Sequence, residues 1–586
     1  MRHLISKLAL PIALVGLLAV AAPHARAATP PPFSLDLVPA ESSTLPSLHS
    51  FVVGEANGKW LVIGGRTNGI HLFVASSDGG TTPPPNAFPP AQANRNLWVI
   101  DPQARQAWSY PLQNLKPAIA DALSTTNANG TQDDKGNLVV IGGYGLDSTT
   151  KQMITFTTVT VLQVGNVINA IIAGQPIDSF IQQYPSVIDC PAWATAAYNQ
   201  CLPGKQADCA SKKGTDQWGP CMSQAAQSCQ SNQSQALQTC AADVLKGNTA
   251  TQNYPVNEGF YTRVAGGGLK RLGNVFYLAF GQNFQGLYSV NEGDYGKWPL
   301  NQVYTERVVM MGFSPDMKTL GVLGQVQQEQ SDPIRQFHRR DLNVHQSLTA
   351  SGTPSIGAYG GVFVIGETGA YRNPIIITQG SSPASANVTV DTSYQQWMSQ
   401  YECAAIPLFD RTSKSMSTVL VGGISLYYLD KKTNELQQDE GLPFIDNLTV
   451  LTNAGSQWSE YVRHQPLDSR MGANGHFGAA PGLARSANGV LYVDGLKTRT
   501  LLGWVYGGIL ADVPHPGESP SRLSKASNAL YEVWLTPTAP AAGYWLQATA
   551  AQTRQSTATG TAPTTTPATA PTTAPTKAPA RPQPKK

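Results

Sequence analysis

The chain has 586 residues, of which 41% are hydrophobic and 13% are charged, and its formal net charge is +3. Eight basic residues belong to the first 27 and the last 36 positions, which leaves 32 basic and 37 acidic residues in the body. A body with this slight acidic excess has no basic face for phosphate contacts, so we expect no nucleic acid partner.

The first 27 residues have the three parts of a secretory signal peptide. A basic start, an apolar stretch and a small-x-small cleavage pattern follow one another: Arg2, His3 and Lys7, then residues 8–22, then Ala25-Arg26-Ala27. We therefore expect cleavage after Ala27 and an exported protein that is extracellular, cell-surface or periplasmic. The alternative is a membrane anchor, which the short apolar stretch and its prolines disfavour. No later segment has about 18 consecutive apolar residues, so we expect no transmembrane segment after cleavage.

Short β-prone runs that end at glycine recur along the body of the chain. The six predicted strands of this kind are residues 59–63, 137–141, 274–280, 361–365, 417–421 and 502–506. The glycines that follow them are Gly64-Gly65, Gly142-Gly143, Gly281, Gly366, Gly422-Gly423 and Gly507-Gly508. Because glycine takes positive φ without a steric penalty, each predicts a tight corner at the end of a strand.

Second strands are predicted downstream of three of these runs. Residues 96–101, which include Trp98, lead into an Asp-Pro turn with Trp108 after it. Residues 424–430 end at Asp430 with Leu436 after it, and residues 529–534 form a weaker copy. The aspartates favour turns, and a late Trp or Leu gives one small sheet an apolar plug against the next.

This order of features resembles the kelch repeat, which builds the blades of β-propellers. The resemblance covers most of residues 45–537 and is best around Gly64-Gly65 and Gly422-Gly423. It implies an all-β, kelch-like β-propeller of six blades, with seven as the alternative, and a generic β-sandwich or two-domain all-β protein as the competing fold. The residues with a structural role in the blades are then Gly64, Gly65, Trp98, Trp108, Gly142, Gly143, Gly422, Gly423, Asp430, Gly507 and Gly508.

Six cysteines form a symmetric series, with intervals of 11, 8, 12, 8 and 11 residues. The symmetry favours nested disulfides, although six cysteines allow fifteen connectivities: Cys190 with Cys240, Cys201 with Cys229, and Cys209 with Cys221. Steps of 8 and 11 are close to whole helical turns, so we expect two antiparallel helices with a turn near Lys213-Gly214. A zinc site is the alternative, but close cysteine pairs and histidines are missing.

Two further expectations concern the surroundings of this insert. Pro203 should break the first arm, so we expect two short helical pieces there. Residues 164–184 are apolar enough to form a helix that docks the insert.

The expected parts of the chain are a signal peptide (1–27), first blades (28–163), a helical insert (164–255), remaining blades (256–550) and a disordered Thr/Pro/Ala-rich tail (551–586).

Cys403 remains unpaired and lies in a predicted strand over residues 401–408. A buried, inert free thiol is the favoured interpretation, with an intermolecular disulfide as the alternative. A galactose-oxidase-like copper site would need a cysteine-tyrosine pair, a second tyrosine and two histidines, and nothing in the sequence assembles them. The histidines after the signal are His49, His71, His338, His345, His464, His476 and His515. We therefore assign no catalytic residue, no metal ligand and no cofactor.

The expected function is that of a secreted or periplasmic, non-catalytic binding or scaffold protein. Its propeller would present a loop face to a glycan or protein partner, because function concentrates on loops held by a rigid frame. The alternative is a secreted carbohydrate-active enzyme, a hydrolase, lyase or copper oxidase, with paired carboxylates or a metal cluster at the mouth of the channel. A third alternative is an assembly subunit that forms oligomers through Cys403 or an exposed strand.

Overall fold

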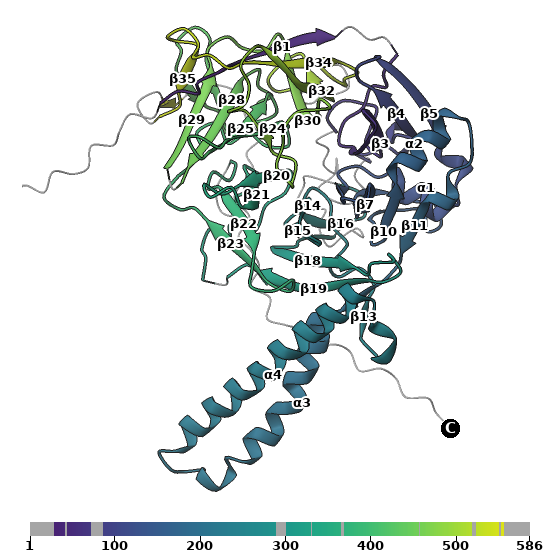
Figure 1. Ribbon diagram of the computed structural model, residues 1–586, viewed down its shortest axis with the longest axis vertical. Helices are drawn as coiled ribbons and strands as arrows, with labels where there is room; N and C mark the ends of the chain where they lie inside the picture. The colour runs from purple at the N-terminus through teal and green to yellow at the C-terminus, as the bar shows by residue number, and fades with distance from the viewer. Residues whose placement is uncertain are drawn as a thin grey trace, which may run out of the picture.

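The computed structural model describes residues 29–40, 44–71, 86–288, 301–329, 331–364, 369–455, 457–517, 523–549 and 553–555. The predicted signal peptide, nearly all of the predicted tail and Gly366 lie outside these ranges. Within them the chain is mostly β, and small antiparallel sheets follow one another around a common centre in a propeller-like arrangement (Figure 1). None of the described helices is both long enough and apolar enough to cross a bilayer.

Six of the sheets, numbered here in chain order, hold most of the strands. Sheet 1 contains β2 (Val52–Ala56), β3 (Lys59–Ile63), β4 (Asn96–Asp101) and β5 (Gln106–Pro111). Sheet 2 contains β6 (Asn129–Gln132), β7 (Asn137–Ile141), β10 (Val159–Gln163) and β11 (Ile181–Tyr184). Sheet 3 contains β14 (Gly268–Leu272), β15 (Val275–Ala279), β18 (Arg307–Phe313) and β19 (Leu320–Gln327), extended by β12 (Val187–Asp189) and β13 (Val256–Asn257).

The second half of the chain continues the series. Sheet 4 contains β20 (Asn343–Leu348), β21 (Pro354–Tyr359), β22 (Ile375–Gln379) and β23 (Ala386–Val390). Sheet 5 contains β24 (Ala404–Asp410), β25 (Ser415–Val421), β28 (Leu448–Ala454), β29 (Gln457–Arg463) and β35 (Trp545–Gln547), with β31 (Leu491–Tyr492) beside β24. Sheet 6 contains β30 (Arg470–Ala479), β32 (Thr500–Ala511), β34 (Leu530–Thr536) and β1 (Ser34–Ala40), with β33 (Ser524–Ala526) beside β32.

Two smaller sheets lie outside this series. One is made of β8 (Tyr144–Asp147), β9 (Gln152–Thr155), β16 (Gln282–Gln285) and β17 (Asn301–Tyr304). The other is made of β26 (Tyr427–Leu429), β27 (Leu436–Gln438) and β36 (Thr553–Gln555). The hydrophobic cores lie between neighbouring large sheets, as between sheets 2 and 3 and between sheets 6 and 1.

The glycine turns connect one large sheet to the next. Four of these glycines have φ between 60° and 90° and donate their N–H to the next sheet at 2.8–2.9 Å: Gly65 to Thr125, Gly143 to Val264, Gly423 to Met471, and Gly508 to Leu48. A Cβ on Gly142 or Gly422 would lie 1.9 Å from a carbonyl oxygen of the neighbouring sheet. The repeated glycines are therefore required by a close backbone approach, as well as by positive φ.

One predicted strand is wrong. Residues 361–365 do not form a strand in the described part of the chain, since Val362 makes only isolated bridges. The strand is β21, which ends just before Gly360 and Gly361, and both of these glycines have positive φ. The glycine pair, and not the hydrophobic run after it, marks the corner here.

The first strand of the chain pairs in sheet 6 with a strand from the C-terminal part of the chain. All seven residues of β1 pair with β34, from Ser34 opposite Thr536 to Ala40 opposite Leu530. Leu35 is fully buried there, and its carbonyl oxygen accepts a hydrogen bond from Arg463 Nη1 at 3.1 Å. An N-terminal segment thus completes a sheet that is otherwise built from the C-terminal part of the chain.

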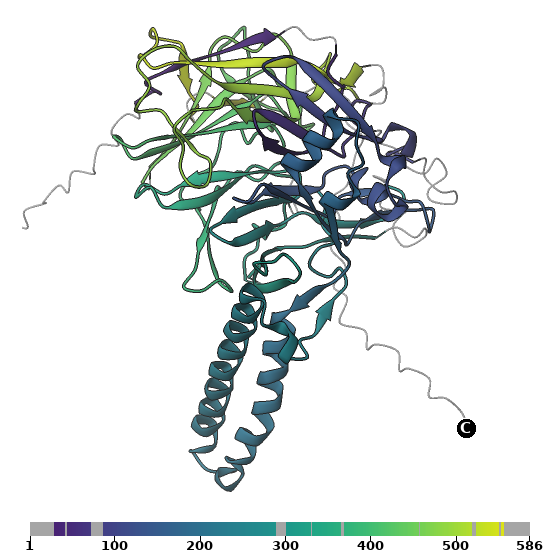
Figure 2. The ribbon, with the colours of Figure 1, turned by 45° about the vertical axis from the view of Figure 1, so that its right-hand side comes forward.

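A helical hairpin extends from the rim next to β18 and β19 (Figures 1 and 2). Its arms are α3 (Cys190–Ala207) and α4 (Trp218–Lys246). Three disulfides join them in nested order, Cys190–Cys240, Cys201–Cys229 and Cys209–Cys221, with Cα atoms 5.5, 5.6 and 5.9 Å apart. Three disulfides fit a chain that folds outside the reducing cytoplasm.

Two expectations about this region are wrong. α3 continues through Pro203 as one helix, because the proline stands in its last turns and disulfides hold the arm on both sides. The other correction concerns residues 164–184, of which only α2 (Val164–Ile172) is an α-helix. α2 packs against sheets 1 and 2, not against the hairpin, and β11 joins sheet 2. The fourth helix, α1 (Pro117–Leu123), lies in the same part of the molecule (Figure 1).

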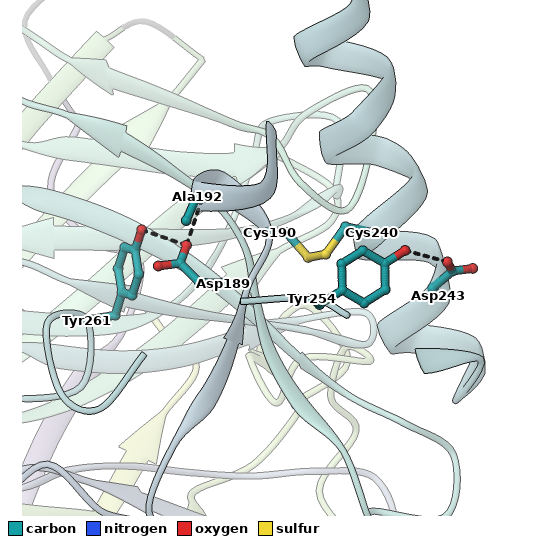
Figure 3. Close-up of a disulfide and its surroundings, with 7 residues drawn as sticks. All are labelled: Asp189, Cys190, Ala192, Cys240, Asp243, Tyr254 and Tyr261. Atoms are coloured by element: carbon teal, nitrogen blue, oxygen red, sulfur yellow. Dashed lines mark hydrogen bonds between the residues drawn. A yellow bond between two sulfur atoms is a disulfide. The ribbon is translucent and has the colours of Figure 1, made fainter. Parts of the chain in front are cut away.

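The base of the hairpin is tied to sheet 3 (Figure 3). Asp189 Oδ1 accepts hydrogen bonds from Ala192 N at 2.9 Å and from the Tyr261 hydroxyl at 3.1 Å, so it caps α3 and ties it to a loop of the sheet region. The Tyr254 hydroxyl donates to Asp243 Oδ2 on α4 at 2.6 Å. Side-chain hydrogen bonds therefore fix the base of both arms of the hairpin.

Candidate functional site: the central cavity

A cavity of about 140 Å³ lies where the first strands of the large sheets converge. Six of its lining residues form a circle, which we call the polar ring, and all six have positive φ: Ser50, Asn127, Gly266, Asp341, Glu402 and Asn474. Each belongs to a different large sheet, in or just before its first strand. The cavity is thus built from segments that are far apart in sequence.

Backbone hydrogen bonds link five of the six neighbouring pairs in the polar ring. They run from Asn127 N to Ser50 O at 3.2 Å, from Gly266 N to Asn127 O at 3.0 Å, from Asp341 N to Gly266 O at 2.7 Å, from Ser50 N to Asn474 O at 3.1 Å, and from Asn474 N to Glu402 O. The sixth pair, Asp341 and Glu402, is linked through the side chain of Asn127. These bonds fix the backbone around the cavity. The side chains of the ring therefore extend from a fixed backbone.

Two carboxyl groups share one amide in this ring. Asn127 Nδ2 donates to Asp341 Oδ1 at 3.2 Å and to Glu402 Oε1 at 3.0 Å. Burial, followed by the nearby charge of Asp341, raises the pKa of Glu402 well above its usual range. Burial also raises the pKa of Asp341, although Arg340 and Asn127 act to lower it. The pair therefore retains a proton at higher pH than ordinary carboxyl groups and offers both a donor and an acceptor.

Arg340 is the cation next to this pair. Its Nε lies 3.4 Å from Asp341 Oδ2, and its Nη1 donates to Gln282 Oε1 at 2.7 Å. Its guanidinium carbon lies 4.7 Å from the centre of the Phe363 ring, a cation–π distance. Only 6% of the side chain is exposed, so the guanidinium is a fixed part of the wall.

Aromatic side chains form another part of the wall. Phe88 lies edge-on to Tyr144 at 5.4 Å, and His71 lies 4.7 Å from Phe88 and 5.0 Å from Tyr288 between ring centres. The Tyr144 hydroxyl donates to the Gly286 carbonyl at 2.6 Å. Aromatic faces next to convergent polar groups are typical of a pocket for a small organic ligand.

None of the residues predicted to shape the blades lines this cavity, although four of the glycines directly precede lining residues: Gly65 before Arg66, Gly143 before Tyr144, Gly423 before Ile424, and Gly508 before Ile509. Trp98 and Trp108 are half-buried on β4 and β5, and Trp98 Nε1 donates to Asn94 Oδ1 at 3.2 Å. Asp430 Oδ1 accepts backbone hydrogen bonds from Lys432 at 2.7 Å and from Thr433 at 3.0 Å, as expected for a turn aspartate. Gly507 and Gly508 lie inside the long strand β32 instead of ending it, and both have positive φ.

Cys403 and the histidines do not assemble into a metal site in the described ranges. Cys403 lies immediately before β24, is 4% exposed, and burial raises the pKa of its thiol to about 12. Of the histidines, His49 and His71 line the cavity. Burial lowers the pKa of His49 to about 3, so its imidazole is neutral.

The sequence interpretation missed Asp341, Glu402 and Asn127. They belong to no short motif, and the two carboxyl groups are brought together only by the neighbouring position of sheets 4 and 5. One signal was present, because Asn127, Asp341 and Glu402 each stand two residues before the first strand of a large sheet. Aligning the predicted repeats at those first strands would have shown that all three residues occupy the same position relative to their strands.

Comparisons with known proteins give little further guidance. No protein-family profile and no curated protein matches the chain. Among 127 matching chains of solved structures is one described as "Structure of YjhT", with a TM-score of 0.36 and 9% sequence identity. That match covers 83% of this chain and 99% of that chain, and at this level of similarity it adds no argument about fold or function.

Proposed function

We propose that this chain is an exported, non-catalytic binding protein, a closed six-bladed propeller that holds a sugar or the end of a glycan in its central cavity. The observation that carries the proposal is the carboxyl pair of Asp341 and Glu402, joined by Asn127 beside an aromatic wall. Fixed hydrogen-bonding groups suit the hydroxyls of a sugar, and aromatic faces suit its C–H surface.

Hydrogen bonds between sheets support the proposed blade arrangement. The glycine turns connect sheet 1 to sheet 2, sheet 2 to sheet 3, sheet 5 to sheet 6, and sheet 6 back to sheet 1. Gly281 N likewise donates to Arg339 O, which lies at the start of sheet 4, at 2.8 Å. The pairing of β1 with β34 would hold the circle closed. In this proposal the hairpin is a second recognition element, and the tail is a spacer.

The direct test is calorimetric titration of the purified protein with a panel of neutral mono- and oligosaccharides. Replacing Glu402 with Ala should weaken binding roughly 3- to 10-fold, because it removes a fixed hydrogen-bonding group and a typical hydrogen bond contributes about 0.5–1.5 kcal/mol. Glu329→Ala is the matched control, since Glu329 is exposed. Absence of any sugar binding, or unchanged binding by Glu402→Ala, would refute the proposal.

A second candidate function is hydrolysis of a glycosidic bond, and the same carboxyl pair favours it. Two oxygens within 3.2 Å of one nitrogen lie closer together than the roughly 6.5–9.5 Å of an inverting glycosidase and nearer to the roughly 5 Å of a retaining one. The raised pKa of Glu402 would suit a general acid. Release of phenol from aryl glycosides, lost by about 100-fold or more in Asp341→Asn and Glu402→Gln, would identify an enzyme.

A further inference from the structure

Phe363 lines the central cavity and is also open to solvent. It is 46% exposed, whereas the two other phenylalanines of the wall are more deeply placed: Phe88 is half-buried and Phe284 is 2% exposed. This combination places Phe363 at the mouth of the cavity. A ligand enclosed by the cavity alone therefore leaves much of this ring in water.

The protein already covers one face of the Phe363 ring. The guanidinium carbon of Arg340 lies over the ring, 4.7 Å from its centre, and Nε of the same guanidinium lies 3.4 Å from Asp341 Oδ2. Since the Arg340 side chain is only 6% exposed, it holds the ring in a fixed position relative to the carboxyl pair. The exposed surface of Phe363 is therefore the opposite face and the edge of the ring.

A stacked pair of rings lies on another side of Arg340. Its guanidinium carbon is 5.7 Å from the centre of the Tyr304 ring, and Tyr304 stacks on His338 with ring centres 3.6 Å apart and an interplanar angle of 22°. Tyr304 and His338 are half-buried and do not line the cavity. Together with Phe363 they form an aromatic surface beside the cavity, arranged around one fixed guanidinium.

We propose that Phe363 is the platform of a second sugar subsite, so that the ligand of this protein is the end of an oligosaccharide and not a free monosaccharide. This inference rests on the proposed sugar-binding function. The terminal unit occupies the cavity, and the C–H surface of the next unit lies on the open face of the Phe363 ring. Stacking there removes from water an apolar surface that the protein itself leaves exposed.

Calorimetric titration of the full-length mature protein with paired sugars tests this subsite. The pairs are glucose with cellobiose, mannose with mannobiose, and N-acetylglucosamine with chitobiose. In the pair that binds, the wild-type protein should bind the disaccharide roughly 5- to 10-fold more tightly than the monosaccharide, the gain expected from covering about one ring face of apolar surface. Phe363→Ala should reduce this preference to about 2-fold or less.

The chain offers a matched control for this change. Phe260 is 58% exposed, and the guanidinium carbon of Arg307 lies 4.0 Å from its ring centre, so it has the same arrangement of ring and arginine away from the cavity. Phe260→Ala should keep the full preference for the disaccharide. Phe363→Tyr should also keep it, and Phe363→Leu should lose most of it, because leucine retains apolar bulk without a flat ring face.

The outcomes separate this inference from the proposed function. Equal affinity of the wild-type protein for the two sugars of a pair, or an unchanged preference in Phe363→Ala, would overturn the second subsite and leave sugar binding by the cavity intact. Binding of none of the sugars would overturn both.

A second measurement uses only the wild-type protein. In saturation-transfer NMR, irradiation of the aromatic protons of the protein should saturate the protons of both units of the bound disaccharide. Transfer confined to the terminal unit would show that the second unit does not lie on an aromatic ring, and the inference would then be wrong.

Discussion

Asn127 donates hydrogen bonds to two carboxyl groups that come from different sheets, and these two groups share their protons. Because burial raises the pKa of both Asp341 and Glu402, and the charge of Asp341 raises that of Glu402 further, the native protein binds protons that the unfolded chain releases. Binding of these protons stabilises the native state at low pH. The stabilisation is lost as the pH rises above the usual carboxyl range towards the higher pKa of the native pair.

Glu402→Gln should therefore be more stable than the wild-type protein at pH 7, by on the order of 1 kcal/mol, since it removes a charge that is costly to bury. The difference should be much smaller at pH 4, where the carboxyl group is protonated in the native state and largely protonated in the unfolded chain. Urea unfolding at the two pH values measures it. Glu329→Gln should show no such pH dependence, and an equally stabilising effect of Glu402→Gln at pH 4 would contradict the explanation.

Cys403 should be inert in the native protein. It is 4% exposed and burial raises its pKa to about 12, so both access and thiolate formation are suppressed. Without reductant, iodoacetamide at pH 8 should add no group to the native chain and one group to the chain unfolded in urea. Intact mass spectrometry counts the additions. Alkylation of more than one cysteine after unfolding would contradict the three disulfides.

At the scale of elements, the hairpin depends on glycines in the sheet beneath it. A Cβ on Gly321 in β19 would lie 2.8 Å from a methyl group of Val244 in α4, and Val244 is fully buried. Gly321→Ala should destabilise the protein by about 1–3 kcal/mol, because it overpacks this contact. Chemical denaturation followed by circular dichroism measures the loss.

Gly219→Ala is the matched control within α4. No atom lies within 4 Å of its added Cβ, so the change should be neutral or stabilise the helix by about 1 kcal/mol. Similar destabilisation by both changes would show that α4 does not press on β19 as described.

The sequence predicted several elements closely, and the exceptions have a common cause. The runs at 59–63 and 137–141 coincide with β3 and β7, since apolar β-prone residues and a glycine pair agree there. Residues 361–365 and 164–184 were misassigned because apolar runs do not reveal which neighbour covers them. Cysteine spacing favoured the observed order of the disulfides among fifteen possible connectivities, but continuation of α3 through Pro203 depends on tertiary constraints that spacing does not express.

At the scale of the whole molecule, β1 determines whether sheet 6 is complete. Leu35 is fully buried in the core shared by sheets 5 and 6, whereas Val38 on the same strand is 38% exposed. Leu35→Ala should cost about 2–5 kcal/mol, and Val38→Ala should change stability by about 0.5 kcal/mol or less. Guanidinium unfolding curves compare the two. Equal effects would mean that β1 adds little to the fold.

The candidate site was the part of the molecule least accessible from sequence. Its two carboxyl groups are contributed by different sheets, and no local pattern states that sheets 4 and 5 are neighbours. The repeated strands and glycines predicted a propeller-like arrangement, and hence a centre where loops converge. They did not predict that Asn127, from sheet 2, reaches both Asp341 and Glu402 across that centre.

The pairing of β1 with β34 can form only late in the synthesis of the chain. Roughly 500 residues separate the partners, and at about 5–20 residues per second the ribosome needs at least about 25 seconds to make them. Throughout that interval β1 is an unpaired strand that could add to another nascent chain. Cells that make this protein rapidly should therefore need a holding factor for its N-terminal segment, and a high rate of synthesis should lower the yield of folded protein.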